Sequence, residues 1–182
     1  MQKLSIKSGD DWVEYSHSPV FSREELPSGS ARLVAGVPGG NSVVLFQMLE
    51  HMAPPFYLLY LLHTPRGEGV SGRYQSPALS ELELKDFLGR FSQFLGMDAR
   101  HDVWVHSPGS NATVVWDRHN LIYAYGPTAR FESALRQIGF TAGSAKVDFV
   151  HAHHYRAEYD ADSKAVLIYF DWSYSQLRPE DE

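Results

Sequence analysis

The sequence predicts the α+β class: a largely antiparallel β-sheet built from hairpins, with two amphipathic helices packed on one face. Three observations predict it. Short strand-like segments follow one another between turn signals, as in a hairpin-connected sheet. Two stripes of apolar residues at helical spacing interrupt them, within residues 84–95 and 131–138. The hydrophobic share is 43% and the charged share is 21%, which is typical of a folded globule rather than a disordered chain.

Residues 1–182 are expected to form a single domain. Domains usually hold roughly 100–200 residues, and a chain of 182 residues is long enough to bury a core without covalent staples. The chain has no cysteine and nine histidines. The missing cysteine excludes disulfides, cysteine-ligated zinc, iron–sulfur clusters and thiol nucleophiles. A metal would therefore need histidine and carboxylate ligands.

The N-terminal third is expected to be a meander of strands. The first ~30 residues are polar and turn-rich, with one short strand around Trp12, Val13 and Tyr15. Further strands are predicted at residues 32–37, 42–49, 56–63 and 72–76. A turn at 38–41 should join the first two of these, because glycine and asparagine tolerate positive φ. The strand at 56–63 is apolar on both faces, which predicts a position inside the sheet.

The first helix has the clearest local signals in the sequence. Ser80 and Glu83 have the spacing of a capping box, in which each side chain bonds a backbone amide of the other. The predicted buried stripe consists of Leu84, Phe87, Leu88, Phe91 and Leu95. Gly96 stands where a left-handed C-terminal cap is expected.

The next stretch is expected to return to strands before a second helix. Strands are predicted at residues 102–106, 112–116 and 121–125, the last two joined by a turn at 117–120. Gly126-Pro127 should open the second helix, since proline at an early position needs no donor. Its predicted buried stripe consists of Phe131, Ala134, Leu135 and Ile138. Gly139 should end the helix, with Phe140 folding back in a Schellman cap.

The C-terminal part is predicted to be a hairpin of residues 147–158 and 164–170 around a turn at 160–163, followed by a frayed tail at 178–182. The expected order of hairpin, loop, helix and terminal glycine occurs twice, in 41–96 and 111–139. This order suggests a pseudo-repeat of two related halves.

Charge and apolar runs limit the classes of partner. The net charge is −6, which argues against nucleic-acid binding because no basic stripe is present. The longest apolar run, Phe56 to Leu62, falls far short of the ~20 residues of a membrane span, and no export signal opens the chain. We therefore expect a soluble cytoplasmic protein with no membrane partner. The oligomeric state stays open.

The acidic excess gathers at the C-terminus and suggests a binding surface. Residues 147–182 hold 8 acids and 3 bases, a net −5. The predicted binding residues are Glu158, Asp160, Asp162, Trp172 and Tyr174. Tyrosine and tryptophan are enriched in interface hot spots, although these two could instead tuck the C-terminus onto the sheet. The first functional hypothesis is therefore a non-catalytic binding or accessory protein without a cofactor, whose acidic hairpin engages a protein partner. A basic partner would complement its charge.

The histidines at 151–154 support the alternative hypothesis. His151 and His153 are two apart, so in a strand they share a face, with His154 on the other side. They could supply two ligands to a divalent zinc, iron or nickel ion, and Glu158 a third. The alternative function is a small metal-dependent enzyme in which a metal-bound water is the nucleophile. Without a metal, the histidines would serve as polar aromatic residues of a half-buried or exposed strand.

The order His-x-His-x-x-x-x-Glu resembles the first metal motif of the cupin family, over residues 151–158 only. The sequence departs from the family pattern by having Ala165 where a glycine is expected and no histidine after His154. Strand parity also places Glu158 on the opposite face. The resemblance therefore implies a three-ligand site and nothing further.

Two other motifs have structural interpretations that we favour. Residues 67–72 match G-x-G-x-x-G, but the following residues predict a strand or loop rather than the helix that a pyrophosphate site requires. Asp117-Arg118-His119-Asn120 could pair a base with a carboxylate, yet it has the composition of a β-turn. No complete catalytic set is evident.

Overall fold

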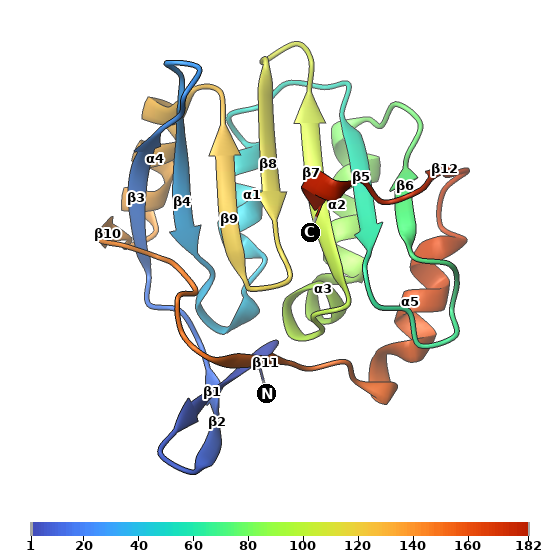
Figure 1. Ribbon diagram of the computed structural model, residues 1–182. Coiled ribbons are helices and arrows are strands. Elements are labelled where there is room, and N and C mark those ends of the chain that lie inside the picture. Colours follow the sequence, from blue (N-terminus) through green and yellow to red (C-terminus); the bar gives the residue numbers. More distant parts are fainter. Residues whose placement is uncertain (1, 182) are drawn as a thin grey trace.

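The computed structural model describes residues 2–181 and confirms the α+β class, with a large, mostly antiparallel sheet (Figure 1). Within residues 2–181, nine strands form this sheet, and only the β10–β3 pair is parallel. In spatial order they are β10 (Thr141–Ala142), β3 (Val20–Glu25), β4 (Ala31–Gly36), β9 (Leu121–Tyr125), β8 (Ala112–Trp116), β7 (His101–Ser107), β5 (Tyr57–Leu62), β6 (Gly72–Gln75) and β12 (Ser173–Ser175). The apolar strand predicted at 56–63 is β5, which lies inside the sheet as expected.

A second, three-stranded sheet pairs the N-terminal hairpin with a short strand near residue 150. It consists of β11 (His151–His153), β1 (Leu4–Ser8) and β2 (Asp11–Tyr15), in that order. The strand expected around Trp12–Tyr15 is thus present as β2, whereas β1 and β3 are additional strands in the first 30 residues. Figure 1 shows the β1–β2 hairpin extending away from the large sheet, with β11 crossing below its central strands.

Helices cover one face of the large sheet. The α-helices of residues 2–181 are α1 (Val43–Leu49), α2 (Glu81–Arg90), α3 (Ser92–Met97), α4 (Thr128–Gln137) and α5 (Asp160–Leu167). Figure 1 shows α1, α2 and α4 behind the sheet. Alternate strand residues such as Leu58, Tyr60 and Leu62 of β5 are buried in the core. Among residues 2–181, the opposite face carries no α-helix and only the short 3₁₀ helix at Pro179–Asp181, so we call it the helix-free face. The candidate cleft described below lies on this face.

The capping box of α2 is confirmed. The Ser80 hydroxyl accepts the Glu83 amide, and the Ser80 amide donates to the Glu83 carboxylate at 2.8 Å. The expected helix is interrupted at Phe91, which has φ −100° and ψ 10°, and continues as α3. Gly96 lies inside α3 and is not a left-handed cap, so that prediction was wrong. Its role is steric: a Cβ on Gly96 would overlap the backbone of Gly40.

The Schellman cap of α4 is confirmed as well. Gly139 has φ 89°, and its amide donates to the carbonyl of Arg136 at 3.1 Å. The Phe140 amide donates to the carbonyl of Leu135 at 3.0 Å, which is the second bond of the motif. Phe140 is buried, as the expected hydrophobic contact requires.

The predicted strand at 42–49 is wrong, because Val43–Leu49 is helix α1. Its buried residues are Val44, Leu45, Met48 and Leu49. This i, i+1, i+4, i+5 pattern is helical, but the β-branched start of the segment resembles a strand. The shared order of elements behind the pseudo-repeat of 41–96 and 111–139 is therefore lost, and the duplication itself stays a prediction.

The predicted C-terminal hairpin is also wrong. Strand β11 pairs with β1 and not with a later strand, and residues 160–167 form helix α5. The predicted turn at 160–163 is the first turn of that helix. Asp160 and Asp162 lie there, where carboxylates favour a helix because its N-terminus carries partial positive charge.

The C-terminal tail is held on the sheet up to residue 181, although a frayed end is expected from its composition. Residues Pro179–Asp181 form a short 3₁₀ helix, η3, that lies in front of β7 (Figure 1). Asp181 is buried, and its carboxylate oxygens accept from Arg73 Nη1 at 2.7 and 3.0 Å. Residue 182 lies outside the described residues.

Among residues 2–181, no helix combines the length and the apolar character needed to cross a membrane.

Candidate metal centre

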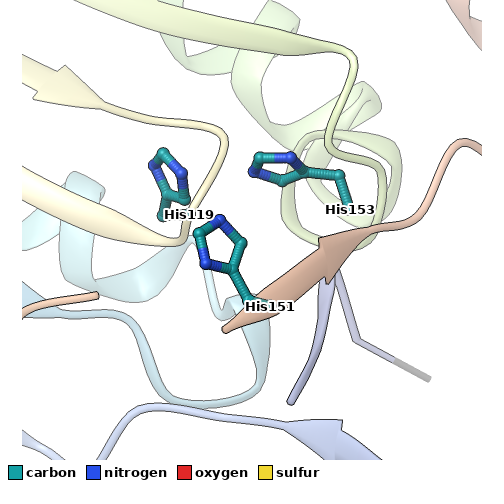
Figure 2. Close-up of side chains that lie close together, drawn as sticks. All are labelled: His119, His151 and His153. Atoms are coloured by element: carbon teal, nitrogen blue, oxygen red, sulfur yellow. The ribbon is translucent and has the colours of Figure 1, made fainter. Parts of the chain in front are cut away.

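Three histidines from two distant segments converge at one end of the sheet. His119 belongs to the turn between β8 and β9, and His151 and His153 belong to β11. One ligand atom from each of the three rings lies within 4.8 Å of the other two. Figure 2 shows the three imidazoles gathered between the β8–β9 turn and β11. All three residues are half-buried.

The turn that carries His119 is fixed by its own side chains. The Asp117 carboxylate oxygen Oδ1 accepts the amides of His119 and Leu121, at 2.9 and 2.8 Å. Asn120 adopts the left-handed conformation with φ 58°, which asparagine tolerates. Its Nδ2 donates to the carbonyl of Gly96 at 3.0 Å. The turn predicted at 117–120 is confirmed, and its backbone holds His119 in a defined place.

Pairing with β1 orients the histidines of β11. Leu4 lies opposite His153 in the antiparallel register, and the His154 amide donates to the carbonyl of Lys3 at 2.8 Å. His151 and His153 then face His119, with their ring centroids 5.2 and 4.8 Å from its own. The His154 ring instead bonds the Ser5 hydroxyl at 2.7 Å. The predicted alternation along this strand therefore occurs.

Hydrogen bonds on the outer side of two rings prepare them as ligands. His119 Nδ1 donates to Asp117 Oδ2 at 2.9 Å, and His151 Nδ1 donates to the carbonyl of Phe149 at 3.0 Å. A proton on Nδ1 leaves the Nε2 lone pair of each ring free to bind a metal. Carboxylates and carbonyls play this orienting role around metal-bound histidines.

His153 contributes a buried nitrogen that lacks a partner. Among the described residues, its Nε2 has no hydrogen-bond partner, although buried polar atoms almost always have one. Burial, together with the neighbouring His119 and Arg118, lowers the pKa of His153 to about 3. The ring is therefore neutral at neutral pH, the state in which imidazole binds a metal.

Buried charged groups surround the turn. The Lys3 ammonium donates to the carbonyl of Asp117 at 3.2 Å and lies 5.0 Å from the Trp116 ring. Burial lowers the pKa of Lys3 to about 8, against the opposing effect of Asp117. On the other side, Asp102 Oδ1 accepts the Arg118 amide at 2.7 Å, and His63 Nε2 lies 3.1 Å from Asp102 Oδ2.

A cleft of about 720 Å³ adjoins the cluster on the helix-free face of the sheet. His119 belongs both to the histidine cluster and to the lining of the cleft. Its lining residues are Arg32, Asp102, Trp104, Thr113, Val115, Asp117, Arg118, His119, Tyr123, Tyr125, Glu180 and Asp181. A ligand bound to an ion at the histidines would thus have room beside His119.

Glu158 is not a member of the group of close ligand atoms. It is exposed on the 3₁₀ helix η2 (Ala157–Tyr159), beyond the end of β11. His119 occupies the third position that the sequence assigned to a carboxylate. The resemblance to the cupin motif thus extends only to the pair His151 and His153.

The other predicted binding residues have separate surroundings. Asp160 forms ion pairs with Arg66 and Arg100, each at 3.1 Å, and Asp162 is half-buried in α5. Trp172 donates to the carbonyl of Val166 at 2.9 Å and packs edge-on against Phe170, so it tucks the C-terminus onto the core.

Tyr174 lies on β12 with 49% of its surface exposed, and its hydroxyl donates to the carbonyl of Ser71.

The glycine-rich motif at 67–72 is structural, as expected. Strand β6 follows it directly, and no helix does. The Glu68 carboxylate turns inward and accepts from Arg100 at 3.0 Å and from Ser163 at 2.8 Å. Glu68 thereby fixes the loop against α5. Because its carboxylate already pairs with the Arg100 guanidinium, that arginine is not available to an anionic ligand at this loop.

His119 is the member of the histidine cluster that the sequence did not predict. Its local signal was present, because Asp117 and His119 have the spacing of a carboxylate that orients an imidazole. That signal pointed to a turn equally well.

No known family, curated protein or solved structure matches this chain. Its function therefore has to follow from the chemistry of the site.

Proposed function

We propose that this protein binds a single transition-metal ion through His119, His151 and His153 and uses it in an enzymatic reaction. The observation that carries the proposal is the convergence of three imidazole nitrogens within 4.8 Å of one another. Orienting acceptors on two of the rings and a buried, unpartnered nitrogen on the third support it.

The ligand set favours zinc. Three imidazoles suit Zn²⁺, Cu²⁺, Fe²⁺ and Ni²⁺, and zinc accepts the tetrahedral arrangement most readily. Zinc–nitrogen bonds of about 2.0–2.1 Å place tetrahedral ligands about 3.4 Å apart. Two ligand nitrogens 4.8 Å apart, the upper limit of the separations in the cluster, would then have to approach each other by about 1.4 Å when the ion binds.

A centre with three protein ligands has an open position. Structural zinc sites are closed by four protein ligands, whereas catalytic sites keep the fourth position for water or substrate. A zinc ion in such a site lowers the pKa of its bound water to about 7 and makes it a nucleophile at neutral pH. Hydrolysis or hydration is therefore the reaction class that this centre supports best.

Metal analysis tests the proposal. Tag-free protein is incubated with zinc, iron and nickel in turn, freed of excess metal and measured by plasma mass spectrometry. We expect about one ion per chain for at least one metal, and near zero for His119→Gln. The matched control is His106→Gln, since His106 is an exposed histidine on β7 outside the cluster. A ratio near zero in the wild type, or equal ratios in both variants, would reject the site.

A second candidate function is the recognition of a basic protein partner by the acidic C-terminal region. The net −5 charge of residues 147–182 and the half-exposed Tyr174 support it. The double variant Glu158→Lys, Asp162→Lys should lose a captured partner, while Asp10→Lys, Asp86→Lys, with the same charge change, should keep it. Asp160 is left intact because it pairs with Arg66 and Arg100. A partner that survives the first variant would contradict this function.

A further inference from the structure

Among the residues that the structure describes, the cleft beside His119 has one cation without a counter-ion. Arg118 lines the cleft, and among residues 2–181 its guanidinium has neither an ion pair nor a hydrogen bond. The nearby carboxylates are engaged elsewhere. Asp117 accepts from His119 and Leu121, and Asp102 accepts the Arg118 amide and faces His63. The Arg118 guanidinium is therefore the group at this end of the cleft that is free to contact an anionic ligand.

Arg32, the other arginine of the cleft, is already neutralised. Its Nε donates to Glu24 at 2.9 Å and its Nη1 to the Tyr125 hydroxyl at 2.8 Å. Its guanidinium lies 4.7 Å from the Tyr123 ring centroid. Arg32 thus serves to hold the tyrosines in place, and Arg118 is the arginine available to a ligand.

A row of aromatic and apolar side chains crosses the cleft. Tyr123, Val115 and Trp104 lie opposite one another across β9, β8 and β7, so their side chains form one row on the helix-free face. Among the described residues, the buried indole Nε1 of Trp104 has no hydrogen-bond partner. Because Trp104 lines the cleft, its indole ring, and not this buried N–H, is the part that a ligand can contact.

The same face already holds one carboxylate. Asp181 reaches it from the C-terminal tail and bonds Arg73, whose guanidinium lies 5.8 Å from the Trp104 ring. An acidic group beside an arginine and an aromatic ring is therefore a combination that this surface stabilises. Asp181 and Glu180 also line the cleft and form part of its rim.

We propose that the cleft binds a small organic oxyanion, a carboxylate or a phosphate monoester carried by an aromatic body. The anionic group lies at Arg118 beside the histidine cluster, and the aromatic body lies on the row of Tyr123, Val115 and Trp104. Such an oxyanion would be the substrate class of the proposed metal centre, and its role as a substrate rests on that proposed function. The contact with Arg118 itself does not require the ion.

Calorimetric titration tests the ligand class on the full chain, both metal-free and zinc-loaded. The probes are phenyl phosphate and benzoate, with benzyl alcohol as the neutral aromatic control and inorganic phosphate as the anion without a body. We expect at least one aromatic oxyanion to bind about tenfold more tightly than both controls, and the tighter of the two identifies the head group. Equal binding of all four compounds, or binding of none, would overturn the proposal.

Two arginine variants test the position of the anion. Arg118→Gln keeps the backbone amide that donates to Asp102. It should lower the affinity for the oxyanion by about 10- to 100-fold, as the loss of a charge-assisted hydrogen bond does. Arg130→Gln removes an exposed arginine of α4 and should have no effect. Equal affinities of the two variants would overturn the inference.

The metal content of each sample separates this inference from the proposed function. An oxyanion that binds through Arg118 in a protein that takes up no metal would refute the metal centre and leave the ligand class standing. A metal-loaded Arg118→Gln that binds the probes as the wild type does would refute the ligand class and leave the metal centre standing.

Discussion

Replacing Asp117 by asparagine should weaken metal binding without dismantling the turn. Asp117 Oδ1 accepts the amides of His119 and Leu121, and its Oδ2 accepts the Nδ1 proton of His119. Asparagine has the same shape, so its single oxygen can keep the two amides. Its NH₂ group then faces Nδ1 of His119 and can only donate, which moves the imidazole proton to Nε2. That proton blocks the lone pair that would bind the metal.

The expected loss of metal affinity follows from one contact, the hydrogen bond between His119 Nδ1 and Asp117 Oδ2. Loss of such a partner typically costs 10- to 100-fold in metal affinity, or about 1.4–2.8 kcal/mol. The other two ligands keep their environments, since Phe149 still accepts from His151 and the pairing of β11 with β1 is untouched. We therefore expect weakened binding rather than complete loss.

Competition with a chromophoric zinc chelator measures this affinity, and urea unfolding of the metal-free proteins reports on the fold. The matched control is Asp148→Asn, because Asp148 is an exposed carboxylate near β11 that pairs only with Lys146 among the described residues. Asp148→Asn should bind zinc as the wild type does. Unchanged zinc affinity in Asp117→Asn would refute the reasoning, as would an equal loss in the control.

Three further predictions concern the fold. Ser80→Ala should lower the free energy of unfolding by about 1 kcal/mol in urea, because α2 loses its capping box; no change would contradict the assigned cap. Gly96→Ala should destabilise far more than Gly89→Ala, since only the Cβ at position 96 meets backbone; similar urea midpoints would contradict the close contact with Gly40. The unfolded chain binds more protons than the folded one between pH 8 and 10.5, because burial lowers the pKa of Lys3 from 10.5 to about 8. Unfolding free energy should therefore gain a component of about 3 kcal/mol as pH rises through this window, and Lys3→Met should remove it; identical pH profiles would contradict the burial.

Local signals in the sequence predicted much of the sheet and two helices. The apolar strand at 56–63 could be placed inside the sheet because both of its faces are apolar. The capping box at Ser80 and Glu83 and the glycine at 139 are short-range devices, so their partners lie within a few residues.

The failures occurred where two structures share one local pattern. Residues 42–49 begin with β-branched valines, yet their buried positions follow a helical spacing. Residues 160–167 contain two aspartates that suit a turn and the first turn of a helix equally well. Packing against the rest of the chain decides such cases.

Two of the three histidines of the candidate site could be predicted from the sequence, because their arrangement depends on a local pattern. The alternation along a strand placed His151 and His153 on one face. Their approach to His119 depends on the pairing of β11 with β1 and on the course of the β8–β9 turn. No local pattern encodes a contact between segments so far apart in the chain. Only the structure shows that His119, and not Glu158, lies beside the other two histidines.

X-ray absorption at the zinc edge of the loaded protein tests the central claim most directly, because it counts the imidazoles around the ion. The three-histidine centre predicts three imidazole nitrogens at about 2.0–2.1 Å together with one light non-protein ligand. His119→Gln should lower the imidazole count if any zinc remains bound. One or no imidazole in the wild type, or the same spectrum in His119→Gln, would contradict the metal centre.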